Sequence, residues 1–219
     1  MTANSSPAAN LIGSVRAEGK SGAGSDVPAG EYSSHKFQFA ERVDYSSFKE
    51  FVVSIEGPVG AKPVPPEKPL SVGTRHVVQK GAQFDPHVVP VVLGTTIEWP
   101  NYDEIYHNVF SISEAKQFDL DLYKGNPPEK RVTFDKPGRV DVFCSIHANM
   151  HCVVLVMENP YFAVTDSRGH YSITNVPPGT YKLKAWHERM PPQIKEIQVP
   201  ENGDVKTDFL LTIANLPKY

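Results

Sequence analysis

Short apolar runs separated by turn-forming residues dominate the chain. Val, Ile, Phe and Tyr fill these runs, and twenty prolines and fifteen glycines interrupt them at short intervals. Convincing stretches of ten or more residues with apolar positions at i, i+3, i+4 and i+7, the pattern of an amphipathic helix, are missing. The pattern therefore predicts an all-β protein built from short strands joined by turns.

The strand-like runs are densest between residues 72 and 157, and their spacing suits a β-sandwich of two sheets packed face to face. These runs cover residues 75–84, 87–101, 106–112, 130–144 and 150–158. After Asn159-Pro160 the pattern changes. Hairpin turns are expected at 166–169 and 177–179, YKLKAWH (181–187) alternates with period two, and residues 194–211 supply two more strands. We predict a second, smaller β-sandwich in this part of the chain.

The N-terminal part of the chain is less regular. Residues 1–10 form a lead that, like residues 17–34, is rich in Ser, Gly and Ala, and we expect both stretches to be flexible. LIGSV (11–15) and FKEFVVSIEG (48–57) have strand patterns, and GAKPVPPEKP (60–69) is typical of a proline-stiffened linker. The first residues show neither the positive region nor the apolar region of a secretion signal.

Charge and hydropathy exclude two classes of partner. The chain has 22 basic and 25 acidic residues, and this near balance predicts no nucleic-acid partner. None of the apolar runs approaches the ~20 residues that a membrane-spanning helix needs. We therefore expect a protein that does not span a membrane.

The most distinctive segment is FCSIHANMHC (143–152), which holds both cysteines of the chain, two histidines and a methionine. Copper accepts thiolate and imidazole ligands, with a thioether as a weak axial partner. Cys144, His147 and Met150 supply three such ligands from one loop, and His107 on an earlier strand offers the second imidazole.

Other interpretations of this segment stay open from the residues alone. Structural zinc usually takes four Cys or His ligands without Met. A binuclear copper site needs two cysteines four residues apart, and these two are eight apart. A cysteine nucleophile paired with a histidine lacks a recognisable nucleophile loop. A Cys144–Cys152 disulfide is a plausible structural alternative, because an extracellular chain with two cysteines often joins them.

Several motifs within residues 72–157 resemble those of the cupredoxins, the type 1 blue copper proteins of the amicyanin and plastocyanin kind. FDPHVVPVVLGTTIEWPN (84–101) is similar to the family's paired strands. In WPNYDEIYHNVF (99–110) an Asn stands six positions before a His, as in amicyanin. FDKPGRVDVFCSIHANM (134–150) resembles the family's G-x5-C-x2-H strand and loop, with the short spacing to Met.

This resemblance implies roles for individual residues. One copper ion would be bound by Cys144, His107 and His147, with Met150 as the axial ligand at longer range. Asn108 would offer its backbone N–H to the Cys144 sulfur, and the Asn101 side chain would hold the ligand loop. His151 is expected to point away from the copper, since neighbouring residues of a strand face opposite sides. Cys152 is expected to be a small buried hydrophobe.

The longer pattern, in which residues 161–188 directly follow the cupredoxin-like segment, is similar to periplasmic methylamine-utilisation-type cupredoxins. Residues 161–188 resemble a carboxypeptidase regulatory-like, or prealbumin-like, β-sandwich. The expected fold is thus a cupredoxin Greek-key β-sandwich at 70–158 and a smaller β-sandwich at 159–215. Strands from residues 11–57 would complete the second sandwich, so that the cupredoxin is inserted into it.

The function that follows is that of a mononuclear copper protein, not an enzyme. It would carry single electrons between redox partners, a cytochrome or an oxidoreductase, in the periplasm or another extracytoplasmic compartment. Two alternatives remain: a copper-binding or delivery protein, and a non-redox interaction module with a cupredoxin fold.

Overall fold

A computed structural model describes residues 8–19, 43–57, 59 and 74–213 of the chain. These residues form strands, turns and one short 3-10 helix, η2 (Tyr45–Ser47), and none of them lies in an α-helix. The prediction of an all-β protein is confirmed. Nor does this part of the chain contain a helix long and apolar enough to cross a membrane.

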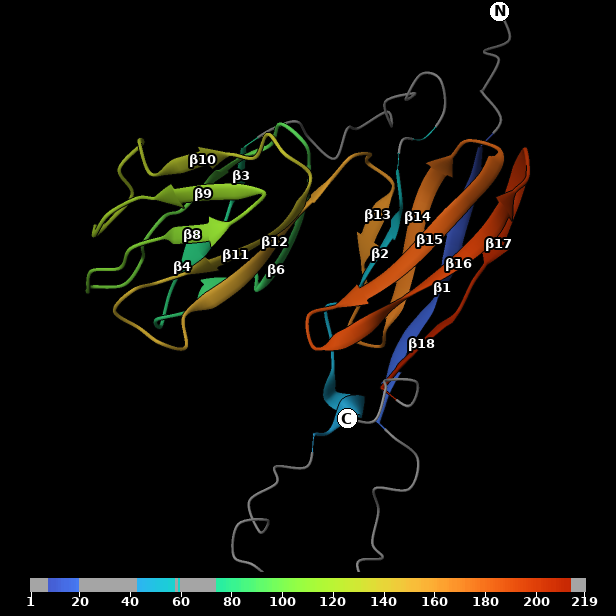
Figure 1. Cartoon of the computed structure of the whole chain (residues 1–219), viewed down its shortest axis with the longest axis horizontal. Coiled ribbons are helices and arrows are strands. Elements are labelled where there is room, and N and C mark those ends of the chain that lie inside the picture. Colours follow the sequence, from blue (N-terminus) through green and yellow to red (C-terminus); the bar gives the residue numbers. More distant parts are fainter. Residues whose placement is uncertain (1–7, 20–42, 58, 60–73, 214–219) are drawn as a thin grey trace, which may run out of the picture.

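The strands between residues 74 and 157 form a first β-sandwich, the green to yellow-brown half of Figure 1. One sheet has the order β10-β7-β3 and the other β6-β12-β11-β8-β9, with a small β4-β5 pair beside them. The strands are β3 (Thr74–His76), β4 (Val78–Gln79), β5 (Phe84–Asp85), β6 (Val88–Val92), β7 (Thr96–Glu98), β8 (Phe110–Ser113), β9 (Lys116–Asp119), β10 (Arg131–Thr133), β11 (Gly138–Phe143) and β12 (His151–Met157). Trp99, Phe134 and Ile97 lie fully buried between the sheets.

The remaining strands form a second β-sandwich. One of its sheets has the order β14-β1-β17, with β18 also paired to β1, and the other has the order β13-β2-β15-β16. The strands are β1 (Ala8–Glu18), β2 (Val52–Ile55), β13 (Phe162–Val164), β14 (His170–Val176), β15 (Gly179–His187), β16 (Met190–Val199), β17 (Asn202–Lys206) and β18 (Phe209–Thr212). Its core takes side chains from both sheets, among them Leu11, Val53 and Leu183.

The N-terminal strands belong to the second sandwich although residues 74–157 separate them from the rest of it. β1, blue in Figure 1, lies among the orange and red strands and pairs antiparallel with β14 and parallel with β17 and β18. β2 pairs with β13 and β15. From these pairings we propose that the domain at 70–158 is inserted into the one completed by 159–215.

Three expectations for the N-terminal part need correction or lie outside the structure. β1 begins at Ala8, so residues 8–10 of the lead expected over 1–10 are strand, because they pair with β17 and β14. At the other end β1 extends to Glu18 and includes the first residues of the stretch expected to be flexible over 17–34. The linker expected at 60–69 falls outside the described residues.

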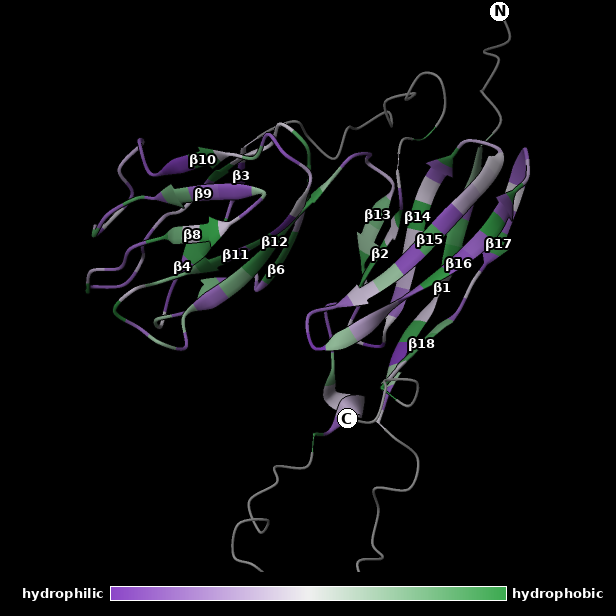
Figure 2. Ribbon diagram, viewed as in Figure 1, coloured by the Kyte–Doolittle hydropathy of each residue, from purple (hydrophilic) through white to green (hydrophobic). Residues whose placement is uncertain are grey.

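The two sandwiches meet through an apolar cluster to which both contribute. Val52 of β2 packs in this cluster with Val88 of β6 and with Val153 and Leu155 of β12. Partly buried Met157 and Trp186 lie against it. Figure 2 shows apolar residues along both β12 and β2, on neighbouring sides of the two halves. One face of the strand β12 therefore packs in the core of the first sandwich, and its other face contacts the second sandwich.

Gly13 of β1 supplies a test of the inserted arrangement. A Cβ atom at this position would overlap the backbone carbonyl oxygen of Thr207, between β17 and β18. Overpacking of this kind typically costs about 1–3 kcal/mol, so we expect Gly13→Ala to destabilise the second sandwich by at least this amount. Arg16→Ala, at an exposed position of the same strand, is the control and should change stability little. Urea unfolding followed by circular dichroism measures both, and equal midpoints would contradict the contact.

Candidate metal centre

His107 is held by its own backbone at the end of the first sandwich. It lies between β7 and β8 and exchanges two backbone hydrogen bonds with Tyr123, one of 3.2 Å from the His107 N–H and one of 2.8 Å to the His107 carbonyl. Its imidazole is fully buried. These two hydrogen bonds fix the position of the His107 backbone.

The loop between β11 and β12 carries Cys144, His147 and Met150. It is closed by a hydrogen bond of 3.1 Å from the Cys144 N–H to the Met150 carbonyl, and by one of 2.9 Å from the Met150 N–H to the His147 carbonyl. The Asn108 side-chain oxygen accepts from the N–H of Ser145, at 2.7 Å, and from its hydroxyl, at 2.9 Å. The residue after the cysteine is thus anchored to the segment that bears His107.

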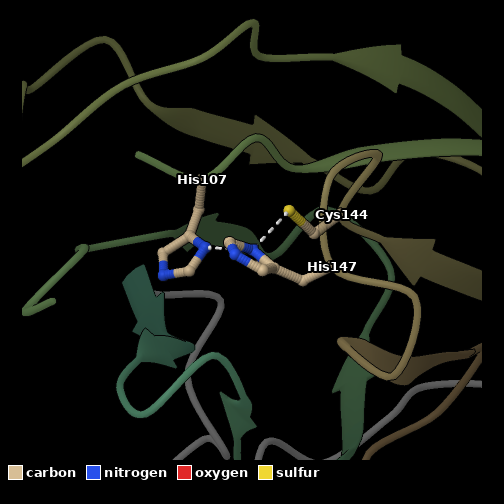
Figure 3. Close-up of side chains that lie close together, drawn as sticks. All are labelled: His107, Cys144 and His147. Atoms are coloured by element: carbon tan, nitrogen blue, oxygen red, sulfur yellow. Dashed lines mark hydrogen bonds between the residues drawn. The ribbon is translucent and has the colours of Figure 1, made fainter. Parts of the chain in front are cut away.

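Three side chains from these two segments converge (Figure 3). The Nδ1 atoms of His107 and His147 are 3.0 Å apart, and the Cys144 Sγ lies 3.6 Å from the His147 Nδ1. Two ligands of one ion can be separated by at most the sum of their bonds, roughly 4.1 Å for two nitrogens and 4.4 Å for nitrogen and sulfur. Both separations are shorter than these limits, and all three atoms lie within 4.8 Å of one another, so they form a candidate site for a single metal ion.

Asp103 sets the tautomer of His107. Its Oδ2 lies 2.8 Å from His107 Nε2. The backbone N–H of Ala82 and that of Gly81 also donate to this carboxylate and lower its pKa to about 2. A carboxylate only accepts, so the Nε2 of His107 carries the proton and its Nδ1 turns a lone pair toward His147 and Cys144. A hydrogen bond to the other ring nitrogen is what metal-binding histidines usually have.

Burial differs among the three side chains. His107 is 0% exposed and Cys144 5% exposed, whereas His147 is partly exposed. Met150 is buried in the same apolar cluster as Cys144. The site therefore lies inside the sandwich and reaches its surface through the His147 ring.

Other residues of the segment 143–152 take structural roles. Cys144 and Cys152 are both free and buried, which removes the disulfide alternative. Cys152 is fully buried, as expected for a small hydrophobe, and burial raises its pKa well above the usual value. His151 turns away from Cys144, stacks on Phe143 and has its Nε2 3.1 Å from Asp141 Oδ1.

Comparison with known families agrees with this geometry. Residues 73–157 match the copper binding proteins of the plastocyanin/azurin family, and residues 152–212 match the carboxypeptidase regulatory-like domain. The chain contains a cupredoxin domain. The regulatory-like match begins inside β12, but β12 pairs with β11 and β6, so this strand is part of the cupredoxin sandwich.

Solved structures of cupredoxins are similar to the same part of the chain. A copper-containing nitrite reductase from Thermus scotoductus SA-01 is 28% identical over 45% of this chain, with a TM-score of 0.36, and the match spans only 26% of that enzyme. A purple cupredoxin from Nitrosopumilus maritimus is 24% identical (37% of this chain, 98% of that one, TM-score 0.32). A pseudoazurin from Sinorhizobium meliloti is 21% identical (40% and 76%, TM-score 0.31). No curated protein matches the chain.

The roles expected for the two asparagines of the cupredoxin domain need one correction. The Asn101 side chain donates to the carbonyls of Ile105 and Tyr123 and accepts from the Asp103 N–H, so it holds the loop before His107 and not the loop after Cys144. Asn108 anchors the cysteine loop through its side chain. The hydrogen bond expected from the Asn108 backbone to the Cys144 sulfur stays a prediction, as does the axial role of Met150.

Sequence reasoning missed Asp103, and a signal for it exists. Asp103 stands four residues before His107 in the sequence. The Asn101 side chain bonds the Ile105 carbonyl and so folds residues 101–105 back, which brings the Asp103 carboxylate to the His107 ring. The neighbouring Glu104, the acidic residue nearer to His107 in sequence, is instead fully exposed.

We expect Asp103→Ala to weaken copper binding by roughly 10–100-fold, because the proton on His107 Nε2 loses its acceptor and the ring its orientation. Glu104→Ala removes a carboxylate from the adjacent exposed position and should leave the affinity unchanged. Competition with a chromophoric copper chelator measures both. Unaltered affinity in a folded Asp103→Ala protein would show that this carboxylate does not orient the ligand.

Proposed function

We propose that this protein is a mononuclear type 1 copper protein that carries single electrons between extracytoplasmic redox partners, in the periplasm or an equivalent compartment. The observation that carries the proposal is the convergence of one sulfur and two Nδ1 atoms within 3.0 and 3.6 Å, with a buried methionine in the same cluster.

The donor set supports copper over other metals. Thiolate and thioether ligands favour copper(I), zinc and iron–sulfur clusters, whereas magnesium and calcium take oxygen ligands. Structural zinc usually binds four Cys or His ligands in a tetrahedron, and this site gathers three such residues. We therefore propose His107, Cys144 and His147 as the strong ligands of one copper ion and Met150 as its weak axial ligand.

When bound, copper would supply the one-electron step, and the protein would supply geometry and shielding. The segment of His107 and the loop of Cys144 are tied to each other and to the strands by hydrogen bonds, which favours the same ligand positions before and after electron transfer. His107 and Cys144 are shielded from water. The ring of His147 is the most exposed of the three side chains, so we propose it as the route from the site to the surface.

Exposed apolar side chains in the two segments that carry His107 and His147 suit a short-lived encounter with a partner protein. The segment before His107 exposes Tyr102 (62%), Ile105 (48%) and Tyr106 (57%), and the cysteine loop exposes Ile146 (51%). Apolar side chains gathered on a surface mark interaction sites, and redox encounters bury little area. A cytochrome or an oxidoreductase docked here would meet His147 directly.

Replacement of the proposed thiolate ligand tests the site. Cys144→Ser should abolish the intense visible band of the copper-loaded protein and leave the unfolding of the copper-free protein nearly unchanged, because a hydroxyl is a poor substitute for a thiolate. Cys152→Ala removes the only other cysteine and should keep the band. Visible absorption and electron paramagnetic resonance spectra report both, and full colour in Cys144→Ser would reject the assignment.

Replacement of an exposed residue tests the carrier role. Ile146→Asp should slow electron exchange with a cytochrome several-fold without a change in the copper spectrum, because a charge would disturb docking beside His147. Ile112→Asp, at a 77% exposed position of β8, is the matched control. Stopped-flow oxidation measures the rates. Slow exchange already in the wild type, together with rapid transfer of copper to a chelator, would favour the copper-delivery alternative.

A further inference from the structure

A second cluster of metal-binding side chains lies where the two domains meet. His87 precedes β6 and His151 begins β12 in the cupredoxin domain, whereas Glu188 lies in the turn between β15 and β16 of the regulatory-like domain. Each of the three residues offers one ligand atom, and these atoms all lie within 4.8 Å of one another. The His87 Nε2 and the Glu188 Oε2 are only 2.9 Å apart.

Each histidine of this cluster is held by a hydrogen bond at one ring nitrogen, and the other ring nitrogen is the candidate ligand atom. The Nδ1 of His87 lies 3.0 Å from the backbone carbonyl of His151, which can only accept, so this nitrogen carries the proton. The Nε2 of the same ring then presents a lone pair to the Glu188 carboxylate. Two acceptors facing each other need a cation between them, either a proton or a metal ion.

His151 is prepared in the same way. Its Nε2 is 3.1 Å from Asp141 Oδ1, so a hydrogen bond to this carboxylate puts the proton on Nε2 and leaves Nδ1 as the free ligand atom. Arg139 donates to both oxygens of Asp141, and the ring stacks on Phe143 at 4.8 Å between centroids. An imidazole oriented by a carboxylate on its other nitrogen is the arrangement common to metal-binding histidines.

We propose that His87, His151 and Glu188 form a second metal site, for a divalent transition-metal ion such as Zn²⁺, that bridges the two domains. Two imidazoles and one carboxylate suit Zn²⁺ and Cu²⁺, and three protein ligands leave one position for water. The side chains of His87 and Glu188 are 36% and 22% exposed, so an ion can enter from solvent. The proposal uses none of the four copper ligands and does not rest on the copper assignment.

Calorimetric titration of the copper-loaded full chain with Zn²⁺ tests the site. The wild type should bind one further equivalent, and His87→Asn and Glu188→Gln should each weaken this binding at least about 10-fold. His170→Asn removes an exposed histidine that faces a carboxylate elsewhere, Asp166 at 3.5 Å, and should bind like the wild type. Cys144→Ser should also retain the zinc equivalent, which separates this proposal from the copper site.

Hydrogen exchange tests the bridge. Zinc should slow exchange at the amides near His87 and, at the same time, at those of the turn around Glu188, and Glu188→Gln should lose both effects. The urea unfolding midpoint of each variant, followed by circular dichroism, shows that the protein is folded. Absence of zinc binding to the wild type, or binding that survives both His87→Asn and Glu188→Gln, would overturn the proposal and leave His87 and Glu188 as an ion pair.

Discussion

The antiparallel pairing of β11 with β12 is the constraint on which both halves of the molecule depend. Its register sets Phe143 opposite His151, so the chain must turn back within residues 144–150. The turn is closed by the bonds between Cys144, His147 and Met150, and these fix the sulfur relative to the ring nitrogens. A slip of one residue would exchange the faces of the strand and carry Cys144 away from His107.

The same strand serves two cores because its side chains alternate. Cys152, Val154 and Val156 lie in the core of the cupredoxin domain, whereas Val153 and Leu155 pack with Val52 of the regulatory-like domain. A strand buried on both faces reads as a continuous apolar run, as CVVLV does here. His151 begins this strand directly after Met150, so the proposed bridging site and the proposed copper site adjoin where the loop enters β12.

Much of this organisation could be predicted from local pattern. Strand-like runs, turns and the spacing Cys-x2-His-x2-Met lie within short segments, and the family resemblance adds the distant His107. Contacts that depend on long-range packing were harder to foresee. LIGSV (11–15) reads as a short strand, yet β1 runs from Ala8 to Glu18, because pairing with β14, β17 and β18 outweighs the weak propensity of Ala and Asn.

The surroundings of the site show the same limit. The roles of Asp103 and Asn101 follow from how a loop folds back, which residue types alone do not specify. His87 and Glu188 carry no motif, and His151 lies in the distinctive segment 143–152 without either partner, since the three meet only after two domains pack together. The opposite error occurs at β2. The apolar pattern predicts a strand over residues 48–57, but β2 begins only at Val52, because Glu50 before it has a positive φ of 59°.

The direct pairing of β2 with β13 has a consequence for folding. Ser54 lies opposite Phe162, so this pairing closes the chain between these two residues into a single long connection. For an unstructured chain the entropy lost on closing such a loop grows with the logarithm of its length. A cupredoxin domain that has already folded brings the two ends near each other and removes most of this loss. The sheet that contains β2 and β13 can then close on two ends that are already held together. Under the proposed insertion, the interrupted domain therefore gains from completing its fold after the domain that interrupts it.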